Sequence, residues 1–185
     1  PSQFMEFWTW DTDSLDLLSE HIETKQHLPQ DLLKSLLDAR FFQSGMQTLR
    51  QIEFALFDLS IHKHSSALNA EQVQATLNDI RQKYAVAPTA SYNRFQHSFS
   101  HIFAGGYAAG YYSYKWAEVL ASDAFDRFEQ EGIFNVQTGK EFRQFILAVG
   151  GKDTALDAFI NFRGREPKID ALLRHQGWTN PSKNA

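Results

Sequence analysis

The chain has 185 residues, enough for a domain with a sizeable core, and its 43% hydrophobic and 22% charged content is usual for a globular protein. A formal net charge of -4 argues against a nucleic-acid-binding surface, which would be basic. Apolar runs such as 145–149 are too short to span a membrane. The absence of cysteine excludes disulfides and thiolate metal sites, and it fits a reducing compartment.

Apolar residues recur at helical spacing along the whole chain, and alternation typical of a strand is not found. We therefore expect an all-α, multi-helical fold. The expected helices cover roughly residues 3–10, 12–21, 29–37, 46–61, 70–84, 107–130, 139–149, 154–162 and 167–173.

Several boundaries follow from capping residues. Asn69 can cap the helix over 70–84, and Gly132 can end the helix over 107–130. Thr138 and Glu141 have the spacing of a capping box, and Asp153 can cap the next helix. Residues 85–100 are expected to be a long irregular connection. Residues 1–178 are expected to form one helical portion, followed by a disordered polar tail over 179–185.

The stretch from His101 to Trp116 is the most unusual part of the chain, because it combines adjacent glycines with a run of tyrosines. A helix that begins at Tyr107 places Tyr107, Tyr111 and Tyr114 on one face. Phenol hydroxyls donate and accept hydrogen bonds, so such a face can bind peptide carbonyls or a developing oxyanion. The alternative is that these aromatic side chains only pack in a core.

Four ordered segments resemble one protein family. They are His101-Ile-Phe-Ala-Gly-Gly-Tyr-Ala-Ala-Gly-Tyr-Tyr-Ser-Tyr, Pro1-Ser-Gln-Phe-Met-Glu-Phe-Trp, Leu49-Arg-Gln-Ile-Glu-Phe-Ala-Leu-Phe-Asp and Phe162-Arg-Gly-Arg-Glu-Pro. Together they resemble the thimet oligopeptidase family of zinc metallopeptidases, in particular its bacterial oligopeptidase A branch. The resemblance extends over nearly the whole chain.

The resemblance implies a cytoplasmic zinc enzyme that hydrolyses short peptides, with neither nucleic acid nor a membrane as partner. Zinc in that family is bound by a His-Glu-x-x-His helix and a further glutamate, and the motif does not occur in this sequence. We therefore expect the zinc ligands to lie outside the chain, on a missing amino-terminal portion of the same polypeptide. This fragment alone should then be inactive, and it could self-associate through the face where that portion docks.

The resemblance also implies the roles of individual residues. His101 and Tyr107 match residues that contact the scissile region of the substrate and stabilise the tetrahedral intermediate. Tyr111 and Tyr114 match tyrosines that line the cleft. Gly105 and Gly106 would let the segment close on substrate.

Other features of the sequence favour simpler interpretations. His97 and His101 lie four residues apart, but a hydrogen-bonding or surface role for His97 is favoured over metal binding. Arg163 and Arg165 could bind a peptide carboxylate, although a salt-bridged turn is favoured.

Carboxylates within helices are expected to face solvent or to pair locally; they are Glu53, Asp58, Glu118 and Asp123. Glu6 could support a neighbouring metal site. A non-enzymatic helical module that binds a peptide or a partner remains the alternative function, and a purely structural helical domain is a third.

Overall fold

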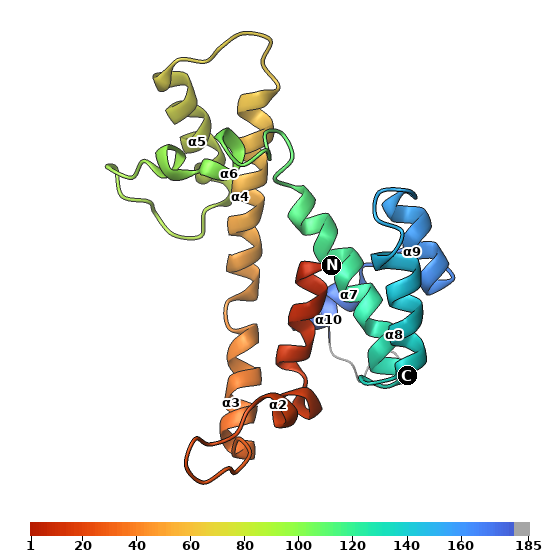
Figure 1. Ribbon diagram of the computed structural model, residues 1–185. Coiled ribbons are helices and arrows are strands. Elements are labelled where there is room, and N and C mark those ends of the chain that lie inside the picture. The colour runs from red at the N-terminus through yellow and green to blue at the C-terminus, as the bar shows by residue number, and fades with distance from the viewer. Residues whose placement is uncertain (180–185) are drawn as a thin grey trace. The chain divides into compact units, whose positions relative to one another are not determined.

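The computed structural model describes residues 1–179, and every regular element within them is helical (Figure 1). The predicted all-α fold class is confirmed. The elements are α1 (Ser2–Met5), η1 (Glu6–Trp10), α2 (Thr12–Leu18), α3 (Gln30–Phe41), α4 (Ser44–His62), α5 (Ala70–Tyr84), η2 (Phe95–Ser98), α6 (Ser100–Phe103), α7 (Ser113–Glu131), α8 (Val136–Phe142), η3 (Arg143–Leu147), α9 (Ala155–Arg163) and α10 (Asp170–His175). All of the expected tail except Thr179 lies outside the described residues.

The chain divides into two compact units. One contains residues 1–42 together with the described residues from Ala117 onward, and the other contains Gln43–Trp116. Within the described residues, no helix is long and apolar enough to cross a membrane.

The first unit is built around aromatic side chains from α1, α7, α8 and α9. Phe4 stacks on Phe142 with ring centroids 4.0 Å apart and meets Phe128 edge to face at 5.7 Å. Phe125 and Phe128 lie one turn apart on α7, so both point into this core. The same buried cluster also contains Ala121, Ala124, Phe159 and Phe162.

Ion pairs of a buried aspartate connect α7 to the end of α9 and to the segment that follows it. Asp123 is only 1% exposed and accepts two hydrogen bonds from Arg165, at 2.7 and 2.6 Å. It also accepts from Arg163 Nε at 3.2 Å and from the backbone N–H of Lys168 at 2.7 Å. Arg163 reaches Asp126 as well, at 2.8 Å. The geometry supports the structural interpretation of Arg163 and Arg165 over a role in binding peptide carboxylates.

The second unit is formed by α4, α5 and the short helices η2 and α6. Its buried cluster contains Phe57, Leu77, Ile80, Phe99 and Ile102. Asn69 caps α5 as predicted, and it forms a reciprocal capping box with Gln72. Glu53 on α4 accepts a hydrogen bond from Arg81 on α5 at 2.8 Å, which links the two long helices.

Several predicted boundaries are wrong. The helix expected from Tyr107 begins at Ser113, because residues 108–112 form turns. The irregular connection expected over 85–100 ends earlier, since η2 and the start of α6 lie within it. Asn135 rather than Thr138 caps α8, and its side chain accepts from two backbone N–H groups. Thr154 rather than Asp153 caps α9.

Replacing Asp123 by asparagine should lower the free energy of unfolding at pH 7 by about 3 kcal/mol, because arginines are left without their buried partner. Burial raises the pKa of Asp123, but the hydrogen bonds and charges of Arg165, Lys168 and Arg163 outweigh it, so the pKa lies below its ordinary 3.8. The carboxylate therefore stabilises the fold above pH 4, and this stabilisation is lost as the pH falls through the lowered pKa.

Urea unfolding of the two proteins at pH 7 and below pH 3 measures this difference, which should shrink in acid. Asp79→Asn, at an exposed position, is the control and should change stability by less than about 0.5 kcal/mol. A difference that stays the same in acid would contradict the prediction.

Candidate functional site

The structure brings together the histidine and the tyrosines singled out from the sequence. The His101 ring on α6 lies 6.0 Å from Tyr107, 5.9 Å from Tyr111 and 6.3 Å from Tyr114, measured between ring centroids. Tyr107 and Tyr114 stack at 5.1 Å, and Tyr111 meets Tyr114 edge to face, also at 5.1 Å. We call these residues the aromatic cluster.

The predicted reason for this proximity is wrong. Tyr107 and Tyr111 belong to the turns that precede α7, and only Tyr114 lies on the helix itself. The rings meet because the backbone folds back on itself between α6 and α7. Tyr112, expected to point away from the common face, is 44% exposed, and no ring contact joins it to the cluster within the described residues.

Glycines make this reversal sterically possible. A Cβ on Gly105 would lie 2.9 Å from the carbonyl oxygen of His101 and 3.0 Å from its Cα, closer than real Cβ contacts allow. Gly106 has a φ of +78°, a conformation that residues with side chains rarely adopt. The N–H of Tyr107 then donates to the carbonyl of His101 at 3.1 Å. These contacts place Tyr107 beside His101, while closure of the segment on substrate stays a prediction.

A buried carboxylate on α4 holds the turns that carry the tyrosines. Asp58 is fully buried, and its oxygens accept from the N–H of Ala109 at 2.8 Å and from that of Tyr111 at 2.9 Å. Ala109 has a φ of +53°, which is unfavourable for a residue with a Cβ. Backbone strain of this kind persists only where the surroundings enforce it.

The phenol groups of the cluster have different environments. The hydroxyl of Tyr111 donates to Gln51 Oε1 at 3.0 Å, and burial raises its pKa although the charge of Arg50 opposes this. A hydrogen bond with Tyr107, together with burial and the neighbouring phenols, raises the pKa of Tyr114 to about 12. Tyr107 is 37% exposed and His101 is also exposed, so both can reach a bound molecule.

Sequence reasoning missed Gln51 and Asp58. Asp58 was expected to face solvent or to pair locally; it does pair with His62 one helical turn away, but it is buried and also binds a segment 51 residues further along the chain. The signal was present, since Asp58 is a charged residue among the apolar residues of 54–59. Glu53 and Asp123 are likewise buried, each paired with arginine.

Within residues 1–179, the side chains do not form a zinc site. Among the residues that the structure describes, no group of three or more histidine, aspartate or glutamate side chains is placed to hold a metal ion. His97 is exposed in η2 and His101 belongs to the aromatic cluster.

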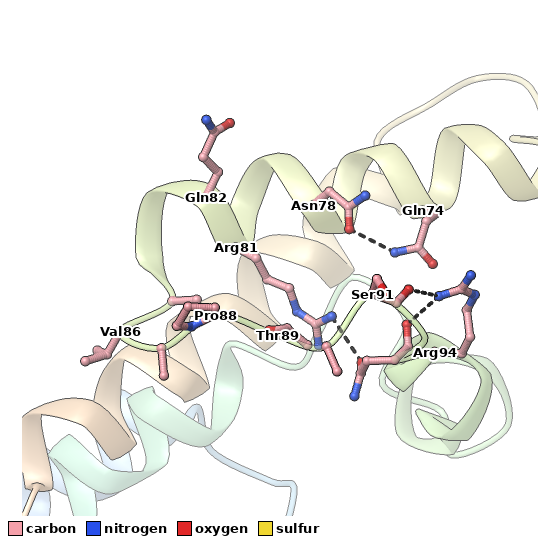
Figure 2. Close-up of a pocket in the computed structure, with 13 residues that line it drawn as sticks. Gln74, Asn78, Arg81, Gln82, Val86, Pro88, Thr89, Ser91 and Arg94 are labelled. Carbon is pink, nitrogen blue, oxygen red and sulfur yellow. Dashed lines mark hydrogen bonds between the residues drawn. The ribbon is translucent and has the colours of Figure 1, made fainter.

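A pocket of about 620 Å³ lies apart from the aromatic cluster, between α5 and the connection that follows it (Figure 2). Arg81 points from α5 towards this connection and donates to Asn93 at 3.1 Å, while Arg94 donates to the carbonyl of Ser91 at 2.9 Å. The pocket is lined by neither His101 nor the tyrosines of the cluster. Each of the two arginines thus hydrogen-bonds to the connection through its Nη1 atom.

The helical fold and the aromatic cluster agree with the resemblance seen in the sequence, and comparison with known proteins identifies the family. The chain belongs to Peptidase family M3, whose family model matches residues 1–178. It is 51% identical over 177 residues to oligopeptidase A of Escherichia coli (strain K12), and the matched residues cover 96% of this chain and 26% of that protein.

Two further relatives come from eukaryotes. The chain is 48% identical over 181 residues to a probable cytosolic oligopeptidase A of Arabidopsis thaliana, covering 96% of this chain and 26% of the relative. It is 36% identical over 181 residues to saccharolysin of Saccharomyces cerevisiae (strain ATCC 204508 / S288c), and the matched residues cover 97% of this chain and 25% of that protein. The chain thus spans about a quarter of the length of the curated relatives it matches.

Replacing each of the adjacent glycines by alanine should have distinguishable effects. Gly106→Ala should cost about 1 to 2 kcal/mol of stability through its positive φ alone, since nothing lies within 4 Å of the added Cβ. Gly105→Ala should also displace His101, whose backbone the new Cβ would strike. Urea unfolding and the NMR signals of the His101 ring measure the two effects. Equal shifts of those signals in both variants would argue against the close approach at Gly105.

Proposed function

We propose that this chain supplies the substrate-binding wall and the oxyanion-stabilising donors of a zinc-dependent oligopeptidase that hydrolyses short peptides. The family membership and the relatives named oligopeptidase support a peptidase. The observation that carries the more specific proposal is the aromatic cluster, in which an imidazole and three phenols gather around the turns whose backbone Asp58 binds.

Hydrolysis adds water to the peptide carbonyl and places negative charge on its oxygen. A donor already aimed at that oxygen stabilises the transition state more than the substrate, and one such donor is typically worth about 10² to 10³ in kcat. Tyr107 and His101 are the donors we assign to this role, because both are exposed. Tyr111 and Tyr114, which are half-buried, would line the cleft.

The hydrogen bond between the phenols of Tyr107 and Tyr114 supports this division of roles. The pKa of Tyr114 is raised to about 12, so its hydroxyl keeps its proton at neutral pH and can donate to the oxygen of Tyr107. With its oxygen accepting in this way, Tyr107 can direct its own O–H to a substrate oxygen.

Zinc and its ligands belong, in this proposal, to polypeptide outside these 185 residues. The fragment alone would therefore be inactive, and the complete enzyme would act in the cytoplasm. The lack of cysteine and the relative named as a probable cytosolic enzyme support that location.

Replacing Tyr107 by phenylalanine in the complete polypeptide should lower kcat by about 100-fold on a short quenched peptide, because one donor to the oxyanion is lost. KM should change little, since the donor acts mainly in the transition state. Steady-state kinetics measure both constants.

Tyr112→Phe is the matched control, because it makes the same chemical change at an exposed tyrosine outside the cluster, and it should leave kcat unchanged. A loss below tenfold in Tyr107→Phe would contradict the oxyanion role. A non-enzymatic peptide-binding module predicts instead that the complete polypeptide binds the peptide and never cleaves it.

A further inference from the structure

We propose that Asp58 is a positioning residue, whose buried carboxylate sets the location of the phenols of Tyr107 and Tyr111 by fixing the turns that carry them. The inference rests on the proposed function, because the position of these phenols matters for turnover only if they bind substrate.

The first support is the way in which Asp58 uses both oxygens. Oδ1 accepts from the N–H of Ala109 and Oδ2 from that of Tyr111, at 2.8 and 2.9 Å. Two backbone groups that are two residues apart can meet one carboxylate only if the residue between them and their own dihedrals are fixed. The positive φ of Ala109 is part of this conformation. The carboxylate therefore specifies the shape of the turn as well as its location.

The second support is a further donor that orients the carboxylate. His62 Nδ1 lies 2.8 Å from Asp58 Oδ1 and 2.9 Å from the backbone oxygen of Asp58. Both neighbours are acceptors, so Nδ1 carries the hydrogen. His62 is one helical turn after Asp58 on α4, and together with the amides of Ala109 and Tyr111 it gives the buried carboxyl group three N–H partners.

The third support is that α4 also holds the other end of Tyr111. Gln51 accepts from the Tyr111 hydroxyl at 3.0 Å, while Asp58 accepts from its backbone N–H. Residues 51 and 58 are seven apart and so lie on the same face of α4. One helix thus binds both the backbone N–H and the hydroxyl of Tyr111.

Another buried carboxylate on the same helix provides a comparison. Glu53 is 1% exposed and accepts from Arg50 at 2.9 Å and from Arg81 at 2.8 Å. Its partners are side chains of α4 and α5, so it stabilises the helix pair. Asp58 instead holds backbone groups of the segment that carries the cluster. Glu53→Gln is therefore a matched control for the loss of a buried charge on α4.

Asp58→Asn in the complete polypeptide tests the proposal, because the amide nitrogen that replaces one oxygen cannot accept a hydrogen bond. We expect faster hydrogen exchange in peptides covering 104–114, measured by mass spectrometry, and a fall in kcat of about tenfold or more with KM within about threefold. Glu53→Gln should lower the melting temperature while leaving both exchange at 104–114 and kcat near those of the unmodified protein.

A double-mutant cycle asks whether Asp58 acts through the phenol of Tyr107. If it does, Asp58→Asn should reduce kcat by less than about threefold in the Tyr107→Phe background. A full tenfold loss in that background would overturn the positioning role. So would unchanged exchange at 104–114 together with unchanged kcat in Asp58→Asn.

Failure of the proposed function gives a different pattern. If Tyr107→Phe retains full kcat while Asp58→Asn still accelerates exchange at 104–114, the oxyanion role fails and the hold on the turn stands. If Asp58→Asn does not fold, His62→Leu replaces it in the experiment. His62 is partly exposed, and its substitution removes only the third hydrogen-bond donor to the carboxylate of Asp58. Exchange and kcat unchanged in His62→Leu would then overturn the proposal.

Discussion

The arrangement of the candidate site depends on one interaction, the binding of two backbone amides by the buried carboxylate of Asp58. A buried charge is costly unless it is fully hydrogen-bonded, so these contacts are strongly favoured once the helix forms. The turns between α6 and α7 form short-range backbone hydrogen bonds, such as the one that the N–H of Gly110 donates to the carbonyl of Tyr107 at 2.8 Å, but no regular helix. Asp58 on α4, which lies far away in the sequence, adds the two bonds that hold these turns against that helix.

The first unit also contains a buried aspartate that binds a distant segment, but its partners are different. Asp123 on α7 is as buried as Asp58, and it also holds a downstream segment, through Arg163, Arg165 and the N–H of Lys168. In both units a long helix thus carries an aspartate that fixes a stretch without regular structure. The difference lies in what is held, since the segment after α9 carries no aromatic cluster and the segment before α7 does.

Much of the fold could be predicted, because helical periodicity and capping residues are local signals. The N-cap at Asn69 and the stop at Gly132 were each visible in the sequence and are confirmed. The start of α7 was predicted wrongly, because the turns before it are stabilised by Asp58, and an interaction across 51 residues leaves no local pattern. The cluster itself was found because its residues are unusual in composition, whereas the residues that position it look like ordinary helix.

Because Asp58 binds backbone amides and not side chains, the sequence of this region can vary in one way but not in another. The contacts of Asp58 involve the N–H groups of Ala109 and Tyr111, which every residue except proline possesses. A change of the Tyr111 side chain thus leaves its backbone hydrogen bond to Asp58 in place, whereas inserting or deleting a residue between positions 109 and 111 would change the spacing of the two amides. Selection or protein engineering can accordingly reshape the chemistry presented here by substitution, while the length of the segment stays fixed.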